Sequence, residues 1–329
     1  MQKHFFILLS VVLAFLLISC NEGGTEPQEV IPGRRDYLWS IDTLAEPSTG
    51  LSITSLLAVD TNKIFIGGFS YDSNQLLYMH DGQDFQNIVQ DQISNLYTIM
   101  EYNSNIFMSD GSSSIYQLTD QNRIKEIYHD SQNQVTFYHY QTYKEKLYVA
   151  GTKARLGGFV IKSFDGLNWS SEFDSNVKDE FMFSFGVSNS TFFLLTVKDD
   201  DFTLYSLRNN VLNSIGQFGY SNIFTIDDNL YIREETGRFF KIINGEVQTW
   251  FNLPAGEIYG ATRARSESDI FIYQVNGIGH YNGIDYKRIV EFDQPHSISG
   301  MDITQNGAFF IVRPISQNYL LLYRGILST

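Results

Sequence analysis

Residues 137–140 read Phe-Tyr-His-Tyr, the densest cluster of titratable aromatic side chains in the sequence. A histidine and a tyrosine can act as base and acid when a proton is removed beside the carboxylate of an acidic sugar, and an arginine can neutralise that carboxylate. The run is also typical of a strand whose side chains pack in a core, and we favour this second interpretation. Strand alternation would point His139 to the face opposite Tyr138 and Tyr140.

Other residues with useful chemistry do not form a recognisable motif. Residues 199–201 are three consecutive aspartates, but a calcium loop alternates its ligands, and three successive side chains cannot all point one way. We therefore predict an exposed loop tip there and no metal site. The six histidines lack ligand spacing, and the sequence contains no nucleophile elbow, phosphate-binding loop or dinucleotide-binding glycine motif. We expect no cofactor.

The composition excludes several classes of protein. Aromatic residues make up 15% of the 329-residue chain and charged residues only 18%, a balance that favours strands over a helical bundle or coiled coil. The formal net charge is -14 and no block of basic residues exists, so we expect no nucleic-acid partner. Cys20 is the only cysteine, so the rest of the chain has no disulfide and no cysteine metal site.

The N-terminus is typical of an export signal. Lys3 precedes an apolar stretch at residues 5–19, which is shorter than the roughly 20 residues of a transmembrane span and suits a signal peptide. Residues 17–20, Leu-Ile-Ser-Cys, closely resemble the bacterial lipobox, in which a small residue precedes a cysteine that is diacylated and becomes the new N-terminus. The resemblance implies lipidation of Cys20. The alternative is an uncleaved anchor helix with an incidental cysteine.

These features predict three segments: a signal peptide at 1–19, the lipidated Cys20 with a flexible tether at 20–33, and a folded domain at 34–329. The tether is polar and carries Gly and Pro, a composition typical of linkers. More than one acyl chain on Cys20 would anchor the protein stably in a membrane. The residue after the cysteine is Asn21 and not an aspartate. In lipoproteins that are sorted by this position, the absence of the aspartate favours the outer membrane of a bacterial envelope.

The predicted domain is a repeat. A short apolar strand recurs after a polar turn, and the first residues of these strands are 38 to 45 positions apart, with a mean near 41. A four-stranded propeller blade takes about 40–50 residues, so residues 34–329 suit seven blades. The alternatives are a two-sheet sandwich or an open solenoid. The recurring strands stand at residues 64–66, 106–108, 147–149, 192–194, 230–232, 270–272 and 309–311.

Each repeat has the same internal order, with the recurring strand second. A tight turn after the third strand carries Asp-Gly, Asn-Gly or Asn-Asn, and such pairs are typical of type I′ hairpins, which need a positive φ at both central residues. The last repeat has no fourth strand, whereas residues 36–41 form an extra strand before the first repeat. We therefore predict a seven-bladed β-propeller that is closed by this N-terminal strand, which would complete the last blade and remove an exposed edge.

The turns carry a resemblance to known propellers. Residues 163–169, Ser-Phe-Asp-Gly-Leu-Asn-Trp, look like a shortened Asp-box, the turn between third and fourth strands of sialidase-like propellers, with weaker copies at 81–85 and 282–286. In those families the turn is structural and lies away from the active site, so the resemblance supports the fold and carries no information on catalysis. The chain after the signal resembles seven-bladed propeller lipoproteins of Gram-negative envelopes, many of them without an assigned activity.

Ligands of propellers usually bind the face built from the loops between second and third strands and the links between blades. Aromatic residues on that face could stack on sugar rings or side chains, and arginines could pair with carboxylates. We predict a non-catalytic binding module for a glycan or an envelope protein. The alternative is a carbohydrate-active enzyme, either a lyase or a glycosidase with two carboxylates about 5–9.5 Å apart. The candidate ligand-binding residues are Tyr138, Arg155, Arg233, Tyr259, His296 and Arg313.

Overall fold

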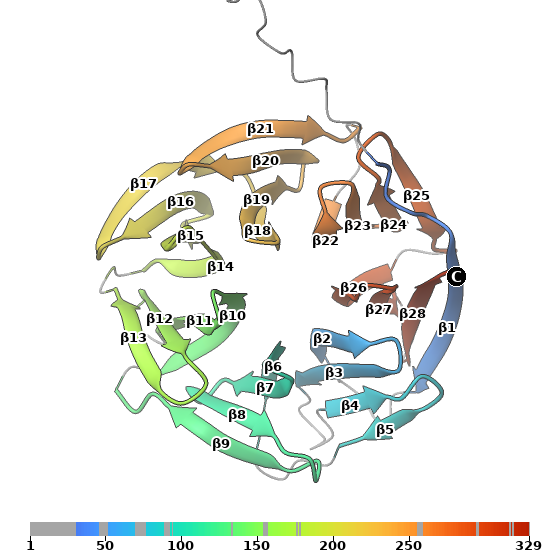
Figure 1. Ribbon diagram of the computed structural model, residues 1–329, viewed down its shortest axis with the longest axis horizontal. Coiled ribbons are helices and arrows are strands. Elements are labelled where there is room, and N and C mark those ends of the chain that lie inside the picture. The colour runs from blue at the N-terminus through green and yellow to red at the C-terminus, as the bar shows by residue number, and fades with distance from the viewer. Residues whose placement is uncertain are drawn as a thin grey trace, which may run out of the picture. The chain divides into compact units, whose positions relative to one another are not determined.

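Among the residues that it describes, the computed structural model contains 28 strands in seven four-stranded antiparallel sheets, arranged as blades around a centre (Figure 1). It describes residues 31–45, 52–69, 77–88, 93, 95–132, 134–153, 157–175, 177, 179–254, 259–293, 296–315, 317 and 319–328. The predicted signal peptide, Cys20 and the tether up to residue 30 lie outside these residues. The compact unit that holds the blades spans Pro32–Thr329. Within the described residues, no helix is long and apolar enough to cross a membrane.

Each blade runs outward from an inner strand to an outer one in chain order, except the last. Blades 1 to 3 consist of β2 (Ser52–Asp60), β3 (Lys63–Phe69), β4 (Leu77–His80) and β5 (Phe85–Asn87); β6 (Leu96–Tyr102), β7 (Asn105–Asp110), β8 (Ser114–Leu118) and β9 (Ile124–His129); and β10 (Val135–Tyr143), β11 (Lys146–Lys153), β12 (Phe159–Phe164) and β13 (Trp169–Asp174). Blades 4 and 5 consist of β14 (Phe181–Ser188), β15 (Thr191–Lys198), β16 (Asp201–Arg208) and β17 (Val211–Phe218); and β18 (Ser221–Ile226), β19 (Asn229–Glu234), β20 (Arg238–Ile243) and β21 (Glu246–Asn252). Blades 6 and 7 consist of β22 (Tyr259–Ser266), β23 (Asp269–Gln274), β24 (Gly277–Tyr281) and β25 (Tyr286–Glu291); and β26 (His296–Ile303), β27 (Gly307–Pro314), β28 (Tyr319–Leu327) and β1 (Tyr37–Ala45).

The seven recurring apolar segments are the second strands of the seven blades, as predicted. A second strand is covered on both faces by neighbouring blades, so its side chains are almost all apolar. Seven hydrophobic clusters fill the spaces between adjacent blades. Between blades 1 and 2, for example, Phe65 packs with Leu96 and Met108. The core is thus a ring of interfaces between blades rather than one central mass.

The predicted closure is confirmed. β1 pairs antiparallel with β28, from Tyr37 opposite Leu327 to Ala45 opposite Tyr319, so residues from both ends of the chain share blade 7. The guanidinium of Arg324 donates a hydrogen bond to the Asp42 carboxylate at 2.6 Å across this pair. The closing strand therefore removes the open edge that β28 would otherwise present.

The turns after the third strands differ from the prediction in three blades. In blades 4 and 5 both central residues have positive φ, as type I′ turns require. In blades 1, 3 and 6 only the glycine has a positive φ, because two further residues enter the loop. The side chains of Asp81, Asp165 and Asn282 each accept hydrogen bonds from the backbone N–H groups two and three residues later. These three loops are therefore one repeated turn, held by its first side chain.

Candidate functional site

Six of the seven inner strands carry a β-bulge near their first residues. The register against the second strand shifts by one residue in these strands, while β18 pairs with β19 without a shift. A bulge leaves an extra residue unpaired and re-aims its side chain, and bulges are frequent next to functional sites. The shifts lie between Ile53 and Ser55, Leu96 and Thr98, Phe137 and His139, Met182 and Ser184, Tyr259 and Thr262, and Ile298 and Gly300.

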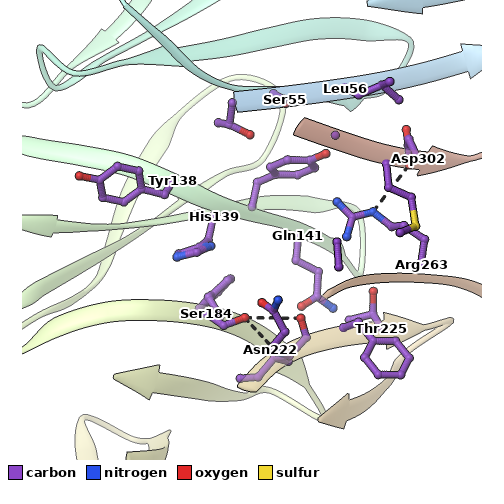
Figure 2. Close-up of a pocket in the computed structure, with 18 of the residues that line it drawn as sticks. Ser55, Leu56, Tyr138, His139, Gln141, Ser184, Asn222, Thr225, Arg263 and Asp302 are labelled. Atoms are coloured by element: carbon purple, nitrogen blue, oxygen red, sulfur yellow. Dashed lines mark hydrogen bonds and ion pairs between the residues drawn. The ribbon is translucent and has the colours of Figure 1, made fainter. Parts of the chain in front are cut away.

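The seven inner strands enclose a cavity of about 610 Å³, which we call the central cavity. β10 contributes five consecutive lining residues, from Tyr138 to Thr142, and every other inner strand contributes between two and four. Figure 2 shows Tyr138 and His139 on one side of the cavity and Arg263 and Asp302 on another. The cavity combines aromatic, amide, hydroxyl and charged groups, a mixture that can hold a polar ligand with partly apolar faces.

Tyr138, His139 and Tyr140 of β10 all line the central cavity, next to the bulge between Phe137 and His139. His139 forms a hydrogen bond with the backbone of Met182 in blade 4. Tyr138 contacts Tyr97 of blade 2, and Tyr140 packs against the cluster between blades 2 and 3, so His139 lies on the other side of the strand from the two tyrosines, as alternation predicts. Tyr138 is 40% exposed, and its ring meets the ring of Tyr97 edge-on at 5.4 Å between centroids.

His139 and Tyr140 are both uncharged near neutral pH. Burial lowers the pKa of His139 to about 4, against a weaker opposing effect from a hydrogen bond to the backbone of Met182. Burial also raises the pKa of Tyr140 to about 12. The imidazole is therefore a weak base at neutral pH, and the phenol keeps its proton. Both groups can exchange hydrogen bonds with a ligand without carrying charge.

Arg263 and Asp302 are the charged residues among the described residues that line the cavity. The Arg263 Nε lies 3.9 Å from the Asp302 carboxylate, and Figure 2 marks this ion pair. Asp302 also accepts a hydrogen bond from the backbone N–H of Ala58 at 2.8 Å, which joins blade 7 to blade 1. Burial raises the pKa of the Asp302 carboxyl, and the nearby guanidinium opposes the shift. The two charges largely compensate one another.

Several polar side chains of the cavity wall hold adjacent blades together. Ser55 accepts a hydrogen bond from the backbone N–H of Ile99 at 2.9 Å, and Ser184 accepts one from Ile223 at 3.0 Å. Gln141 exchanges two hydrogen bonds with the backbone of Val187. These groups fix the wall, so a ligand would meet a preorganised surface.

Arg233 and Tyr259, two of the predicted ligand-binding residues, lie together inside the protein. Arg233 has no exposed surface, and its guanidinium donates a hydrogen bond to the backbone carbonyl of Tyr259. The Tyr259 ring is buried, and its hydroxyl donates to the carbonyl of Pro254 at 3.0 Å. Burial lowers the pKa of Arg233 to about 10, so the group is still a cation at neutral pH. Neither residue lines the central cavity.

The other predicted residues have different surroundings. Tyr138 lines the cavity. His296 is buried with its ring 4.6 Å from that of Phe292, and Arg313 lies half-buried opposite Ser297 in the adjoining strand. Arg155 lies outside the described residues. The structure thus brings Arg233 beside Tyr259 and His296 near Arg313, while the ligand-binding roles of these residues stay predictions.

Arg263 and Asp302 were missed by the sequence analysis. Each of these charged residues interrupts an inner strand that otherwise consists mostly of apolar or small residues. That interruption was the sequence signal that could have identified them. Asp199 and Asp200 form an exposed two-residue turn with positive φ. Across the described part of the chain, no three His, Cys, Asp or Glu side chains are grouped to hold a metal ion.

Comparisons with known proteins support the fold. No protein-family model matches the chain, and no curated protein matches it. Among solved structures, a catalytically inactive virginiamycin B lyase from Staphylococcus aureus with quinupristin is similar, with 11% identity, a TM-score of 0.62, and coverage of 87% of this chain and 99% of that one. The extracellular domain of a candidate one-component system from B. thetaiotaomicron has 14% identity and a TM-score of 0.59, over 86% of this chain and 39% of that one. The Neurospora crassa Pan2 WD40 domain has 12% identity and a TM-score of 0.62, over 91% and 98%. At these identities the likeness concerns the seven-bladed architecture alone.

Proposed function

We propose that this chain is a lipid-anchored protein of a bacterial cell envelope, in the outer membrane, whose propeller binds a glycan or a protein in the central cavity without catalysing a reaction. The observation that carries the proposal is the edge-on pair of Tyr97 and Tyr138, which stands at the cavity on two adjacent blades. Exposed tyrosines give a large contact area at low entropic cost.

The chemistry of the cavity favours a neutral, hydroxyl-rich ligand over a strongly acidic one. Aromatic faces pack on the apolar faces of sugar rings, while side-chain amides such as Asn222 can bond to hydroxyl groups. The positive charge of Arg263 is already offset by Asp302. A strongly acidic ligand would have to compete with that carboxylate for the guanidinium.

Affinity electrophoresis of the full-length protein in mild detergent tests the binding role. Native gels that contain neutral or acidic polysaccharides should retard the protein in at least one neutral polymer. Loss of stain from the polymer around the band would indicate cleavage rather than binding. If no polymer retards the protein, a search for protein partners by crosslinking in intact envelopes decides between the two ligand classes.

A lyase is the second candidate, because Tyr138, His139 and Arg263 all line one cavity. In such a reaction a base removes the proton beside a uronate carboxylate, the glycosidic oxygen leaves with a proton from an acid, and a carbon–carbon double bond forms. The similar Staphylococcus aureus structure is a lyase, although its likeness concerns the fold. The lowered pKa of His139 makes it a weak base at neutral pH, which favours binding. Ultraviolet absorbance of unsaturated products from acidic polysaccharides tests this candidate.

A glycosidase has less support. Asp302 is the only carboxylate among the described residues that line the central cavity, and glycosidases use two carboxyl groups that flank the bond.

The lipid anchor has a separate test. Incorporation of a labelled fatty acid should occur in the native chain and disappear in Cys20→Ser, which should also leave the membrane fraction.

A further inference from the structure

We infer that one face of the propeller rests on the lipid bilayer, through aliphatic side chains at the turns between the third and fourth strands of blades 3 to 6. This inference rests on the proposed lipid anchor and adds the surface with which the folded domain meets the membrane. The four side chains are Leu167, Val211, Ile243 and Ile284, and we call their side of the propeller the turn face.

The topology places these four turns on one side. Because each blade is antiparallel and begins at the same side, the turns between first and second strands and those between third and fourth strands all lie on the turn face. The loops between second and third strands and the links between blades lie on the opposite face.

The chain also enters the propeller at the turn face. The backbone N–H of Gly33 donates to the carbonyl of Asn282, in the turn of blade 6, at 3.0 Å. The N–H of Ser328, at the end of β28, donates to the carbonyl of Asp36 at 3.0 Å. Twelve residues stand between Cys20 and Gly33, and a chain of this length reaches at most about 45 Å. An anchor at Cys20 therefore keeps the turn face near the bilayer.

The apolar side chains of the turn face are strongly exposed. Leu167 is 87% exposed, Ile284 65%, Val211 56% and Ile243 43%. Single exposed apolar residues are ordinary, but here four consecutive blades carry one in or directly beside the turn between the third and fourth strands. Leu167 and Ile284 occupy the same position of the loop, whereas Val211 begins β17 and Ile243 ends β20. Insertion of such side chains among acyl chains removes their surface from water. Nothing in the fold of the described blades covers them.

In blades 3 and 6 the turn is held by its first side chain and does not need an apolar residue. The carboxylate of Asp165 accepts hydrogen bonds from the N–H groups of Leu167 and Asn168, at 2.8 and 2.7 Å, and so closes the turn. Blade 1 has the same turn with Gln83 at the position of Leu167. The aliphatic side chains of blades 3 and 6 are therefore dispensable for the turn itself, and contact with lipid gives them a role.

Tyr138 lies away from the turn face. β10 ends at Tyr143 on the turn face, and Tyr138 lies in the half of the strand nearer the opposite face. The end of the central cavity that holds Tyr138 would then open away from the bilayer. A ligand could reach them without displacing lipid.

The test uses the lipidated full-length protein in phosphatidylcholine vesicles, whose zwitterionic surface does not repel the acidic chain. Cys20 is the only native cysteine and its thiol is blocked by the lipid, so Leu167→Cys, Ile284→Cys and Ile315→Cys each carry one free thiol for an environment-sensitive fluorophore. Ile315 is exposed in the loop after β27, on the opposite face. Aqueous iodide should quench the fluorophore at 167 and 284 at least threefold less than at 315.

A matched variant tests whether protection from iodide depends on the aliphatic side chains rather than on the attached fluorophore. Leu167→Gln with Ile284→Gln places at both turns the residue that blade 1 carries, so the fold should persist. A fluorophore on Val211→Cys should lose its protection from iodide in that background. Ile315→Gln should leave the protection unchanged.

The outcomes separate this inference from the anchor. If the protein does not float with the vesicles, the anchor is wrong and this inference falls with it. If the protein floats but iodide quenches all three sites equally, the inference alone is wrong. Equal protection of 167 and 284 in the soluble Cys20→Ser chain without vesicles would mean that a second copy, and not lipid, covers the turn face.

Discussion

Arg35 donates a hydrogen bond from Nε to Nδ1 of His280, at 3.2 Å, and thereby joins the segment before the closing strand to the third strand of blade 6. The same guanidinium donates to Asp285 at 2.6 Å. On its other side, the His280 Nε2 lies 2.7 Å from the Asp269 carboxylate. Because an arginine always donates, Nδ1 must accept, and the imidazole is neutral with its proton on Nε2. This hydrogen bond forms only while His280 is neutral.

Stability should therefore fall as the pH drops below about 6.5. Burial lowers the pKa of His280, and burial lowers the pKa of His80 and His139 as well. The unfolded chain then binds more protons than the folded chain below pH 6.5, so the free energy of unfolding decreases toward acid, by up to about 1.4 kcal/mol per pH unit for each such histidine. Urea denaturation at pH values from 7.5 to 5 measures the slope.

The variant His280→Gln isolates one contribution to this slope. The free energy of unfolding should be lower at pH 7.5, because the contacts to Arg35 and Asp269 are weakened, and its decline toward pH 5 should be shallower. A slope identical to that of the parent protein would mean that His280 does not titrate between the folded and unfolded states.

Arg35→Ala should destabilise the protein by about 2 kcal/mol, because it removes partly buried, charge-assisted hydrogen bonds that hold the closing segment. Arg34→Ala is the matched control. Arg34 pairs with Asp36 and also donates to the carbonyl of Ser328, but these contacts are exposed to solvent, where they contribute little, so the midpoint of denaturation should move much less than in Arg35→Ala. Equal midpoints for the two variants would contradict the proposed role of Arg35 in closure.

The fold was predictable because its main signals are local or periodic. Second strands are covered on both faces, so residues such as 270–272 stand out as apolar triplets every 40 positions or so. The closing strand was visible as an extra strand at one end and a missing one at the other. The turn type was only partly predictable, since the same Asp-Gly or Asn-Gly pair occurs in two-residue and four-residue loops.

The candidate site was harder to predict because it depends on contacts between blades. The bulge at Tyr138 follows from the pairing of β10 with β11, and no residue type in the run marks it. Arg233 looks from the sequence like an exposed loop cation, yet it lies against the Tyr259 backbone of the next blade. Long-range packing decides which charged side chains face the cavity and which are enclosed.

Replacement of Arg233 tests whether this buried cation serves the fold or a ligand. Within the described residues its guanidinium has one hydrogen bond and no carboxylate partner, and its Nε has none. A buried charge with few partners costs free energy, and an apolar side chain of similar volume is often better tolerated. Arg233→Met should therefore keep or raise the free energy of unfolding, by about 1 kcal/mol, as measured by urea denaturation.

The alanine variant at the same position gives the opposite sign. Arg233→Ala leaves a cavity and should destabilise the protein by about 2–4 kcal/mol. Ligand retention in affinity gels should be unchanged in Arg233→Met. Weaker retention in that variant, with unaltered stability, would indicate that Arg233 serves a ligand, as the sequence predicts.

Tyr138→Ala should weaken retention by a glycan about tenfold, which corresponds to about 1.4 kcal/mol of binding free energy. The reason is that Tyr138 is the exposed member of the pair with Tyr97, so its loss removes contact area from the ligand and leaves the Tyr97 ring without its edge-on partner. Phe181→Ala is the matched control, because Phe181 is a similarly exposed aromatic residue of the neighbouring blade that does not line the central cavity. The dissociation constant from gels at several polymer concentrations is the measurement. If both variants bind like the parent protein while a polymer still retards it, the ligand binds elsewhere than the central cavity.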